Sequence, residues 1–150
     1  MATEERDPSR LRNLPSWLVN QVAIAGNRLV AEALAGAGKR RHHYALLVAL
    51  DEVGPASQAD LGRRIMIDRS DMVAAVNELG EQRLVERAPD PDDRRRNVVT
   101  ITAAGRKRLR ELDRLVAGAQ DELLAPLSAA ERTRLVRLLT RVVDHHATTP

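Results

Sequence analysis

The spacing of apolar residues along the chain predicts a succession of amphipathic helices. Apolar side chains recur at three- and four-residue steps through six segments, which is the period of a helix with one buried face. Capping residues mark the starts of three of these helices: Ser57 and Asp68 each have an aspartate three positions on, and Ser128 with Glu131 forms a capping box. Ser16 is expected to cap the first helix. The six helices are expected to begin near Ser16, Arg41, Ser57, Asp68, Thr102 and Ser128, with Thr102 as the cap of the fifth.

The same period identifies the side chains that should face a core. The last helix, after Ser128, carries Leu and Val over an arc too broad for one solvent-exposed face, which predicts an interface with a second subunit. The positions expected to face inward on the other helices are Leu18, Val22, Ala25, Leu29, Ala33, Leu34, Tyr44, Leu47, Leu50, Val53, Leu61, Ile65, Met72, Val73, Val76, Leu79, Leu109, Leu112, Leu115, Val116 and Leu123.

Between residues 84 and 102 the apolar period changes from 3.6 to 2. Residues 84–87 and 97–102 predict two short strands, and residues 88–96, rich in Pro, Asp and Arg, predict an exposed loop between them. The two short helices before the hairpin, joined by a turn of three or four residues, have the helix-turn-helix pattern. The expected fold class is therefore mainly α with a small β-hairpin.

We expect four segments along the chain. They are a flexible tail at 1–13, an N-terminal helix at 14–39, a helix-turn-helix and hairpin module at 40–102, and C-terminal helices at 103–147. The module is expected to carry the function, and the helices on either side are expected to form a dimer.

The amino-acid composition excludes several classes of protein. The chain has 150 residues, 43% of them hydrophobic, which suits a single domain with a core of aliphatic side chains. The absence of cysteine excludes disulfides and cysteine nucleophiles. No run of about 18 apolar residues occurs, so no membrane association is expected and the predicted location is the cytoplasm, at the nucleoid. Net charge is only +3, but 22 of the 24 basic residues are arginine, whose guanidinium suits phosphate and guanine.

The second helix of the pair has a polar face suited to the major groove of DNA. Arg69 and Asn77 have the bidentate geometry for guanine and adenine, with Ser70 and Ala74 beside them. Asp71 would repel phosphate unless it caps its own helix or accepts from a cytosine amino group. The alternative is that this face is merely the solvated side of an amphipathic helix.

The hairpin loop carries a cluster of charge. Arg94, Arg95 and Arg96 are placed to follow phosphates or to enter a narrow minor groove, and Asp93 could hold one guanidinium in a fixed direction. The alternative is an ordinary solvated turn with balanced charges.

Two stretches of sequence resemble a known family. Residues 93–105 read DRRRNVVTITAAG, which is similar to the wing signature of the multiple-antibiotic-resistance regulator (MarR) family. Residues 58–65, QADLGRRI, and 67–70, IDRS, resemble that family's helix-turn-helix. The match covers residues 40–105 by motif and the whole chain by the order of its helices.

The resemblance implies a winged helix-turn-helix core flanked by dimerisation helices. It implies a homodimeric transcription regulator, usually a repressor, that a small ligand releases from a palindromic operator in double-stranded DNA. On this chain Arg95 would enter the minor groove with Asp93 as its orienting partner, and Ser70 would read the major groove. Ser57 and Gln58 would contact phosphate.

The chain departs from the family pattern at a few positions. Asp71, Val73 and Ala74 stand where the family usually has Thr or Arg on the recognition helix, so the operator sequence cannot be transferred. Arg83 stands where a Gly usually precedes the wing, so the left-handed turn is either strained or supplied earlier by Gly80.

The resemblance also places a ligand pocket near the first two helices. That neighbourhood holds Trp17, His42, His43 and Tyr44, which would suit an aromatic or anionic effector. The alternative for the histidine pair is a surface or capping feature. Adjacent histidines point to different helix faces, so no metal site and no cofactor are expected.

The sequence offers two other classes of protein. A helical adaptor that uses the winged module to bind protein is the alternative to a DNA-binding regulator, but it would not need Arg94–Arg96. An enzyme is not expected, because no nucleophile and base pair, phosphate-binding loop or metal spacing occurs in the sequence.

Overall fold

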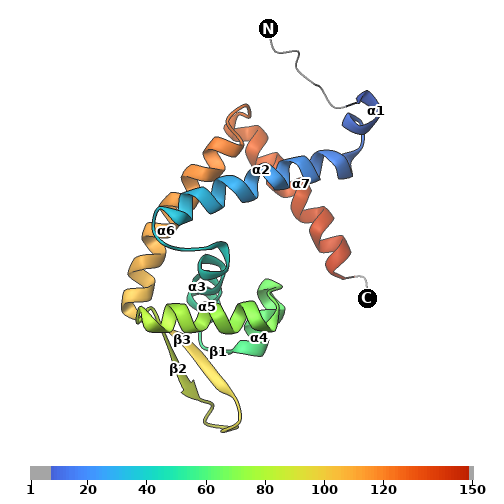
Figure 1. Ribbon diagram of the computed structural model, residues 1–150. Helices are drawn as coiled ribbons and strands as arrows, with labels where there is room; N and C mark the ends of the chain where they lie inside the picture. The colour runs from blue at the N-terminus through green and yellow to red at the C-terminus, as the bar shows by residue number, and fades with distance from the viewer. Residues whose placement is uncertain (1–7, 149–150) are drawn as a thin grey trace.

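A computed structural model describes residues 8–148 of the chain, most of them in helices. Figure 1 shows two ends: α2, α6 and α7 form one, and α3, α4, α5 and a small sheet form the other. No helix among the described residues is long and apolar enough to cross a membrane. The helices are α1 (Ser9–Arg12), α2 (Pro15–Ala35), α3 (Arg41–Val53), α4 (Gln58–Ile65), α5 (Arg69–Glu81), α6 (Ala103–Leu123) and α7 (Ala129–Ala147).

The sheet has three antiparallel strands in the order β1-β3-β2. β2 (Val85–Pro89) and β3 (Asn97–Ile101) form the predicted hairpin, which projects from the end of the molecule as a wing (Figure 1). β1 (Ala56–Ser57) was not predicted, because a strand of two residues has no period of its own and forms only by pairing with β3. This pairing places the start of α4 beside the half of β3 that is nearer the wing loop.

The fold class and most helix starts agree with the sequence prediction. Four predicted capping residues each accept a hydrogen bond from the backbone N–H three positions on; they are Ser57, Asp68, Thr102 and Ser128. The prediction for Ser16 is wrong. α2 begins at Pro15, two residues before the start that a cap at Ser16 implies, and the fixed φ of proline suits the first helical position without a side-chain cap.

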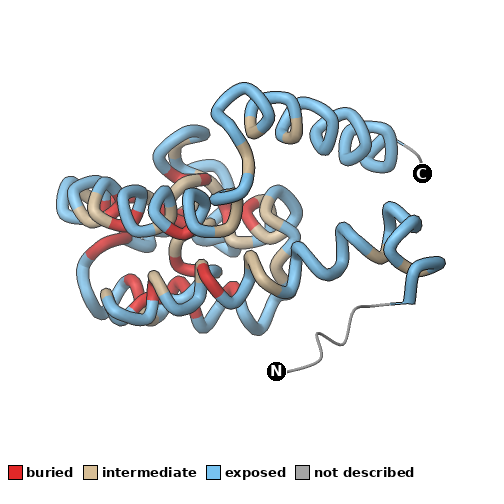
Figure 2. The backbone as a smooth tube through the Cα atoms, turned by 90° about the horizontal axis from the view of Figure 1, so that it is seen from above, coloured by how far each residue is buried: buried red, intermediate tan, exposed pale blue. Residues whose placement is uncertain are grey.

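The core lies at the end of the molecule that carries the sheet. In Figure 2 the buried segments gather away from the two chain ends. Its fully buried side chains come from α2 to α6 and from the sheet. Five predicted inward positions on these helices are wrong; Leu18, Val22, Val53, Val73 and Leu115 are 40%, 48%, 50%, 38% and 39% exposed. No residue of α7 is buried among the described residues, although the helix is rich in Leu and Val. The largest fully buried side chains are Leu34, Leu46, Leu47, Leu50, Leu61, Met72, Val76, Leu79, Val85, Val99 and Leu112.

The sequence allowed two forms of the turn before the wing: one with Arg83 strained and one with Gly80 in the left-handed conformation. The structure has the form in which Arg83 is strained. Arg83 has φ 59°, in the left-handed region that favours glycine, and Gly80 remains inside α5 with a negative φ. Arg83 therefore occupies the conformation itself, and Gly80 does not replace it.

The predicted N-terminal tail is only partly described. Residues 1–7 lie outside the described part of the chain, and Ser9–Arg12 form one helical turn rather than an irregular segment.

Candidate nucleic-acid interface

A groove of about 580 Å³ runs between α4, α5 and the wing. Ser57 and Gln58 line it from the start of α4, and Val73 lines it from α5. The arginines among its lining residues are Arg63, Arg69, Arg95 and Arg96. The groove thus joins the two regions that the sequence singled out, 30 residues apart, into one basic surface.

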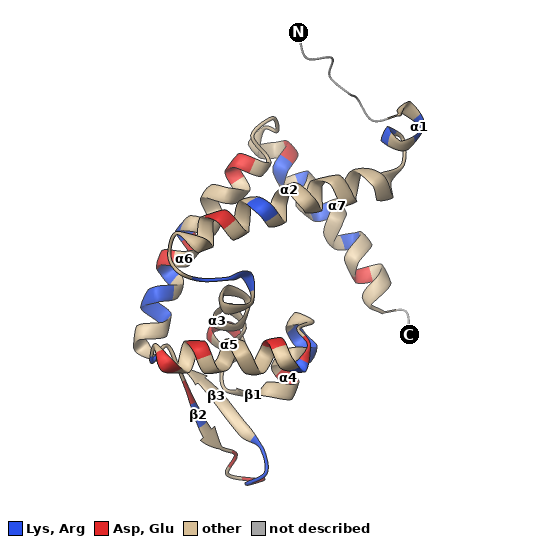
Figure 3. Ribbon diagram, in the orientation of Figure 1, with Lys and Arg blue, Asp and Glu red and all other residues tan. Residues whose placement is uncertain are grey.

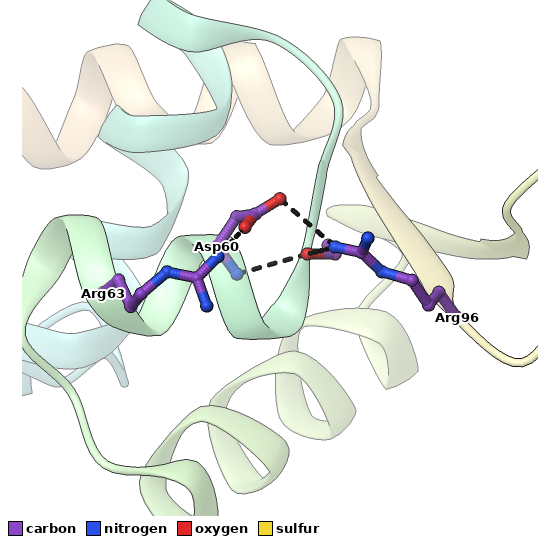
Figure 4. Close-up of polar contacts among 4 residues, drawn as sticks. Asp60, Arg63 and Arg96 are labelled. Atoms are coloured by element: carbon purple, nitrogen blue, oxygen red, sulfur yellow. Dashed lines mark hydrogen bonds and ion pairs between the residues drawn. The ribbon is translucent and has the colours of Figure 1, made fainter. Parts of the chain in front are cut away.

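Arg96, where the wing loop meets β3, joins the wing to the start of α4 through a polar network (Figure 4). The Arg96 guanidinium donates to Ser57 Oγ at 3.0 Å and lies 3.5 Å from Asp60 Oδ2. Asp60 also pairs with Arg63 one turn further along α4. The pKa of Asp60 is below its ordinary value, chiefly through hydrogen bonding to Ser57 and also because of Arg63 and Arg96. The network fixes the wing relative to the helix pair.

Sequence reasoning did not find Asp60 and Arg63 as part of the site. The spacing of Asp60 and Arg63 on one helix was a readable signal for an ion pair. The contact of Asp60 with Arg96 spans 36 residues, and only the fold reveals it.

The tip of the wing holds Asp93 and the two exposed arginines. Asp93 Oδ1 accepts from the backbone N–H of Arg95 at 3.0 Å, so it orients Arg95 through the main chain rather than through the guanidinium. Within residues 8–148 the side chains of Arg94 and Arg95 have no hydrogen-bond or ion-pair partner. The basic tip is visible in Figure 3. These two guanidinium groups are available to an external anion.

The predicted residues of α5 lie on two different sides of that helix. Ser70, Ala74 and Asn77 are exposed on the face opposite the core, and Arg69 lines the groove. Asp71 faces α3 instead, where its Oδ2 lies 3.7 Å from His42 Nε2. The carboxylate that seemed awkward beside phosphate therefore has a cationic partner within the protein whenever His42 is protonated.

The predicted ligand residues on α3 already have partners within the protein. His43 is 4% exposed; its Nδ1 accepts from the Arg40 backbone N–H at 2.9 Å, and its Nε2 lies 2.6 Å from Glu78 Oε2. Since Nδ1 accepts, the ring proton is on Nε2 and is donated to Glu78. The His43 ring thus joins α3 to α5.

Tyr44 is joined to α6 in a similar way. Its hydroxyl donates to Asp113 Oδ1 at 2.7 Å, and burial, helped by this carboxylate, raises the pKa of Tyr44 to about 12. Trp17 lies in the first turn of α2, about 27 Å along the helix axis from the end that meets α3. None of the four predicted ligand residues lines the groove at the wing, and no cluster of three metal-ligating side chains occurs in the described chain.

Because His43 is buried, we expect the stability of the protein to depend on pH. Burial holds the pKa of His43 below its ordinary value of 6.5, so the unfolded chain takes up a proton near pH 6.5 that the folded chain does not. The free energy of unfolding should therefore fall, by up to about 1 kcal/mol, as pH drops from 7 to 5. Urea unfolding at a series of pH values measures it.

A matched pair of variants isolates this effect. His43→Asn keeps an acceptor for the Arg40 N–H without a titrating ring and should lose that part of the pH dependence, whereas His42→Asn should retain it. Identical pH profiles for His43→Asn and the unsubstituted protein would show that His43 does not titrate as described.

The fold and the basic groove are those of a winged helix-turn-helix protein, and comparisons with known proteins assign the family. The sequence model of the MarR family matches residues 39–96. PcaV of Streptomyces coelicolor, solved with its natural ligand, is 30% identical, with a TM-score of 0.70 over 89% of this chain and 94% of that chain. The chain belongs to the MarR family.

Two further relatives extend the comparison. The transcriptional repressor NicR of Pseudomonas putida is 31% identical over 101 residues, which are 67% of this chain and 64% of NicR, so the match spans less than two thirds of that relative. A mutant MarR of E. coli, solved with operator DNA, has the same fold, with a TM-score of 0.75 and 23% identity over 91% of this chain and 99% of that chain.

Proposed function

We propose that this protein is a regulator of transcription that binds double-stranded DNA through the groove between α4, α5 and the wing. The observation that carries the proposal is the wing tip, where Arg94 and Arg95 have no partner within the described chain beside a groove lined by arginine. α5 would enter the major groove and the wing would reach the flanking minor groove. Such a protein acts in the cytoplasm, at the nucleoid.

We propose roles for the predicted DNA-binding residues in this arrangement. Ser57 and Gln58, at the start of α4, would contact phosphate; Ser57 Oγ is already held by Arg96. The base-reading candidates on α5 are Arg69, Ser70, Ala74 and Asn77, while Asp71 would act indirectly through His42. On the wing, Asp93 positions Arg95.

The test of DNA binding uses the protein's own upstream intergenic DNA. We expect the purified protein to shift this duplex at concentrations at least about 1,000-fold below those needed for a scrambled duplex at the same salt concentration. Equal affinity for both duplexes, or no binding to either, would contradict the proposal and favour a module that binds protein.

We further propose that the protein acts as a homodimer on a palindromic operator and represses transcription. The support is the exposed apolar face of α7, where Val136, Leu138, Leu139, Val142 and Val143 are each at least 40% exposed. A monomer would leave these side chains in water. NicR, a relative, is named as a repressor. Footprinting should show protection with two-fold symmetry, and transcription in vitro should fall when the protein is added.

Leu139→Asp should weaken the dimer. The substitution places a carboxylate in an apolar interface twice, once per protomer, so the dissociation constant of the dimer should rise at least about 100-fold. Sedimentation equilibrium measures it. Thr133→Asp adds the same charge to the opposite, polar face of α7 and should leave the dimer intact; equal effects of the two variants would place the interface elsewhere.

We also propose a small aromatic or anionic effector that binds beside α2 and α3. Trp17 lies about 27 Å along α2 from the end that meets α3, so the candidate contacts mark two alternative positions, one at Trp17 and one at His42, His43 and Tyr44. The support is the basic start of α3 and the relative PcaV, which was solved with its natural ligand. His43 would act by holding α3 to α5 rather than by exposing its ring.

A panel of benzene- and pyridine-carboxylates tests the effector. A binding compound should raise the melting temperature, quench the fluorescence of Trp17, the single tryptophan, and release the upstream duplex. Compounds that release DNA without any change in Trp17 fluorescence would place the effector site away from α2.

A further inference from the structure

The DNA-facing side of α5 has an apolar centre. The buried side chains of this helix are Met72, Ala75, Val76 and Leu79. At 100° per residue the opposite face is centred on Ser70, Ala74 and Asn77, with Val73 at its edge toward the wing. Val73 is 38% exposed and lines the groove together with arginines. A valine and an alanine thus lie on the face that a recognition helix turns toward the bases, where polar side chains usually form hydrogen bonds with base edges.

The two polar side chains beside Val73 and Ala74 already form hydrogen bonds within the protein. Ser70 Oγ donates to Asp68 Oδ1 at 2.9 Å, and Asn77 Oδ1 accepts from the Arg87 guanidinium at 2.7 Å. Both contacts hold these side chains to the protein, one to the start of α5 and one to the wing strand β2. Asn77 keeps its amide N–H groups, and the surface beside these two residues presents the methyl groups of Val73 and Ala74.

Only one base feature in the major groove matches a surface of methyl groups. Adenine, guanine and cytosine present nitrogen and oxygen atoms there, whereas thymine adds an apolar C5-methyl group. Covering the methyl groups of Val73 with a polar base edge would remove hydrogen-bonding water from that edge without replacing it. Contact with a thymine methyl instead removes apolar surface from water on both sides.

We propose that Val73, with Ala74 beside it, is a specificity-determining residue that selects thymine in each half-site through contact with the C5-methyl group. The inference rests on the proposed function, because it takes α5 to lie in the major groove. The four arginines of the groove favour the approach of the DNA backbone, which brings Val73 to the base edges. The methyl surface then adds a preference for thymine to the contacts that the arginines make with phosphate and with base edges.

The test replaces thymine by deoxyuridine, which removes the methyl group and leaves every hydrogen-bonding atom in place. Each dT of one half-site of the upstream duplex is replaced in turn, and affinity is measured by fluorescence anisotropy at fixed salt. One or two positions should lose about fourfold in affinity, as expected for one methyl group withdrawn from apolar contact.

Matched variants connect the loss to Val73. Val73→Ala should bind the thymine duplex more weakly and should respond less than twofold to deoxyuridine at the same positions. Val53→Ala truncates another exposed valine, at the end of α3 and outside the groove, and should retain the full fourfold response.

The outcomes separate the inference from the proposed function. Binding to the duplex with no sensitivity to any deoxyuridine, or equal sensitivity in Val73→Ala, would overturn the role of Val73 alone. Failure to bind the duplex at all would overturn the proposed function and this role with it.

Discussion

Gly105→Ala should lower the free energy of unfolding by more than about 4 kcal/mol, or prevent folding altogether. A Cβ atom at position 105 would lie 2.1 Å from the carbonyl oxygen of Leu84 and 2.8 Å from the Ile101 side chain. The Leu84 oxygen cannot move away freely, because it accepts hydrogen bonds from the N–H and the hydroxyl of Thr102. Relieving the clash would pull the first turn of α6 away from the wing.

The same helix supplies the control. Gly118 is exposed on α6 with no atom within 4 Å of the position of a Cβ atom, so Gly118→Ala should stabilise the protein by up to about 1 kcal/mol. Urea unfolding followed by circular dichroism measures both variants. A loss below about 1 kcal/mol for Gly105→Ala would mean that the wing and α6 are not packed this closely.

Arg95→Ala should lower affinity for the upstream duplex by about 10- to 100-fold at fixed salt. The Arg95 guanidinium has no partner in the described chain, so its loss removes a DNA contact without removing a contact within the protein. The free energy of unfolding should therefore stay the same. Titration by fluorescence anisotropy, with urea unfolding alongside, separates the two quantities.

Variants at two other arginines serve as comparisons for Arg95→Ala. Arg137 lies on the polar face of α7, far from the groove, so Arg137→Ala should bind DNA normally. Arg96→Ala should weaken DNA binding and also loosen the wing, because it breaks the contacts to Ser57 and Asp60. If Arg95→Ala bound DNA with unchanged affinity, the wing would have no part in binding.

The features predicted correctly from the sequence depend on short-range signals. Ser57, Asp68 and Ser128 mark helix starts because a capping side chain bonds to a backbone N–H only three residues away. The hairpin was predictable for a similar reason, since its period and its Pro-Asp loop are local. A resemblance carried by residues 93–105 then led to the family.

The features that were missed depend on the fold as a whole. Val73 follows the apolar period of α5 but lies at the edge of the buried arc, where only the positions of neighbouring helices decide exposure. The tie between Arg96 and Asp60, and the bond between His43 and Glu78, each join residues more than 30 positions apart. Periodicity carries no information about such pairs. The interface expected for α7 remains a prediction, because it requires a second chain.

The central claim is that the wing lies along DNA beside α5, and the lack of cysteine in this chain allows a direct measurement. Arg94→Cys introduces a single thiol at the wing tip, to which iron–EDTA is attached for cleavage of the bound upstream duplex. We expect two clusters of cleavage, one at each flank of the protected region, related by two-fold symmetry. Within each cluster the cleavage sites on the two strands should show the offset that marks the minor groove. Normal binding with cleavage only at the centre, or with none, would contradict this claim.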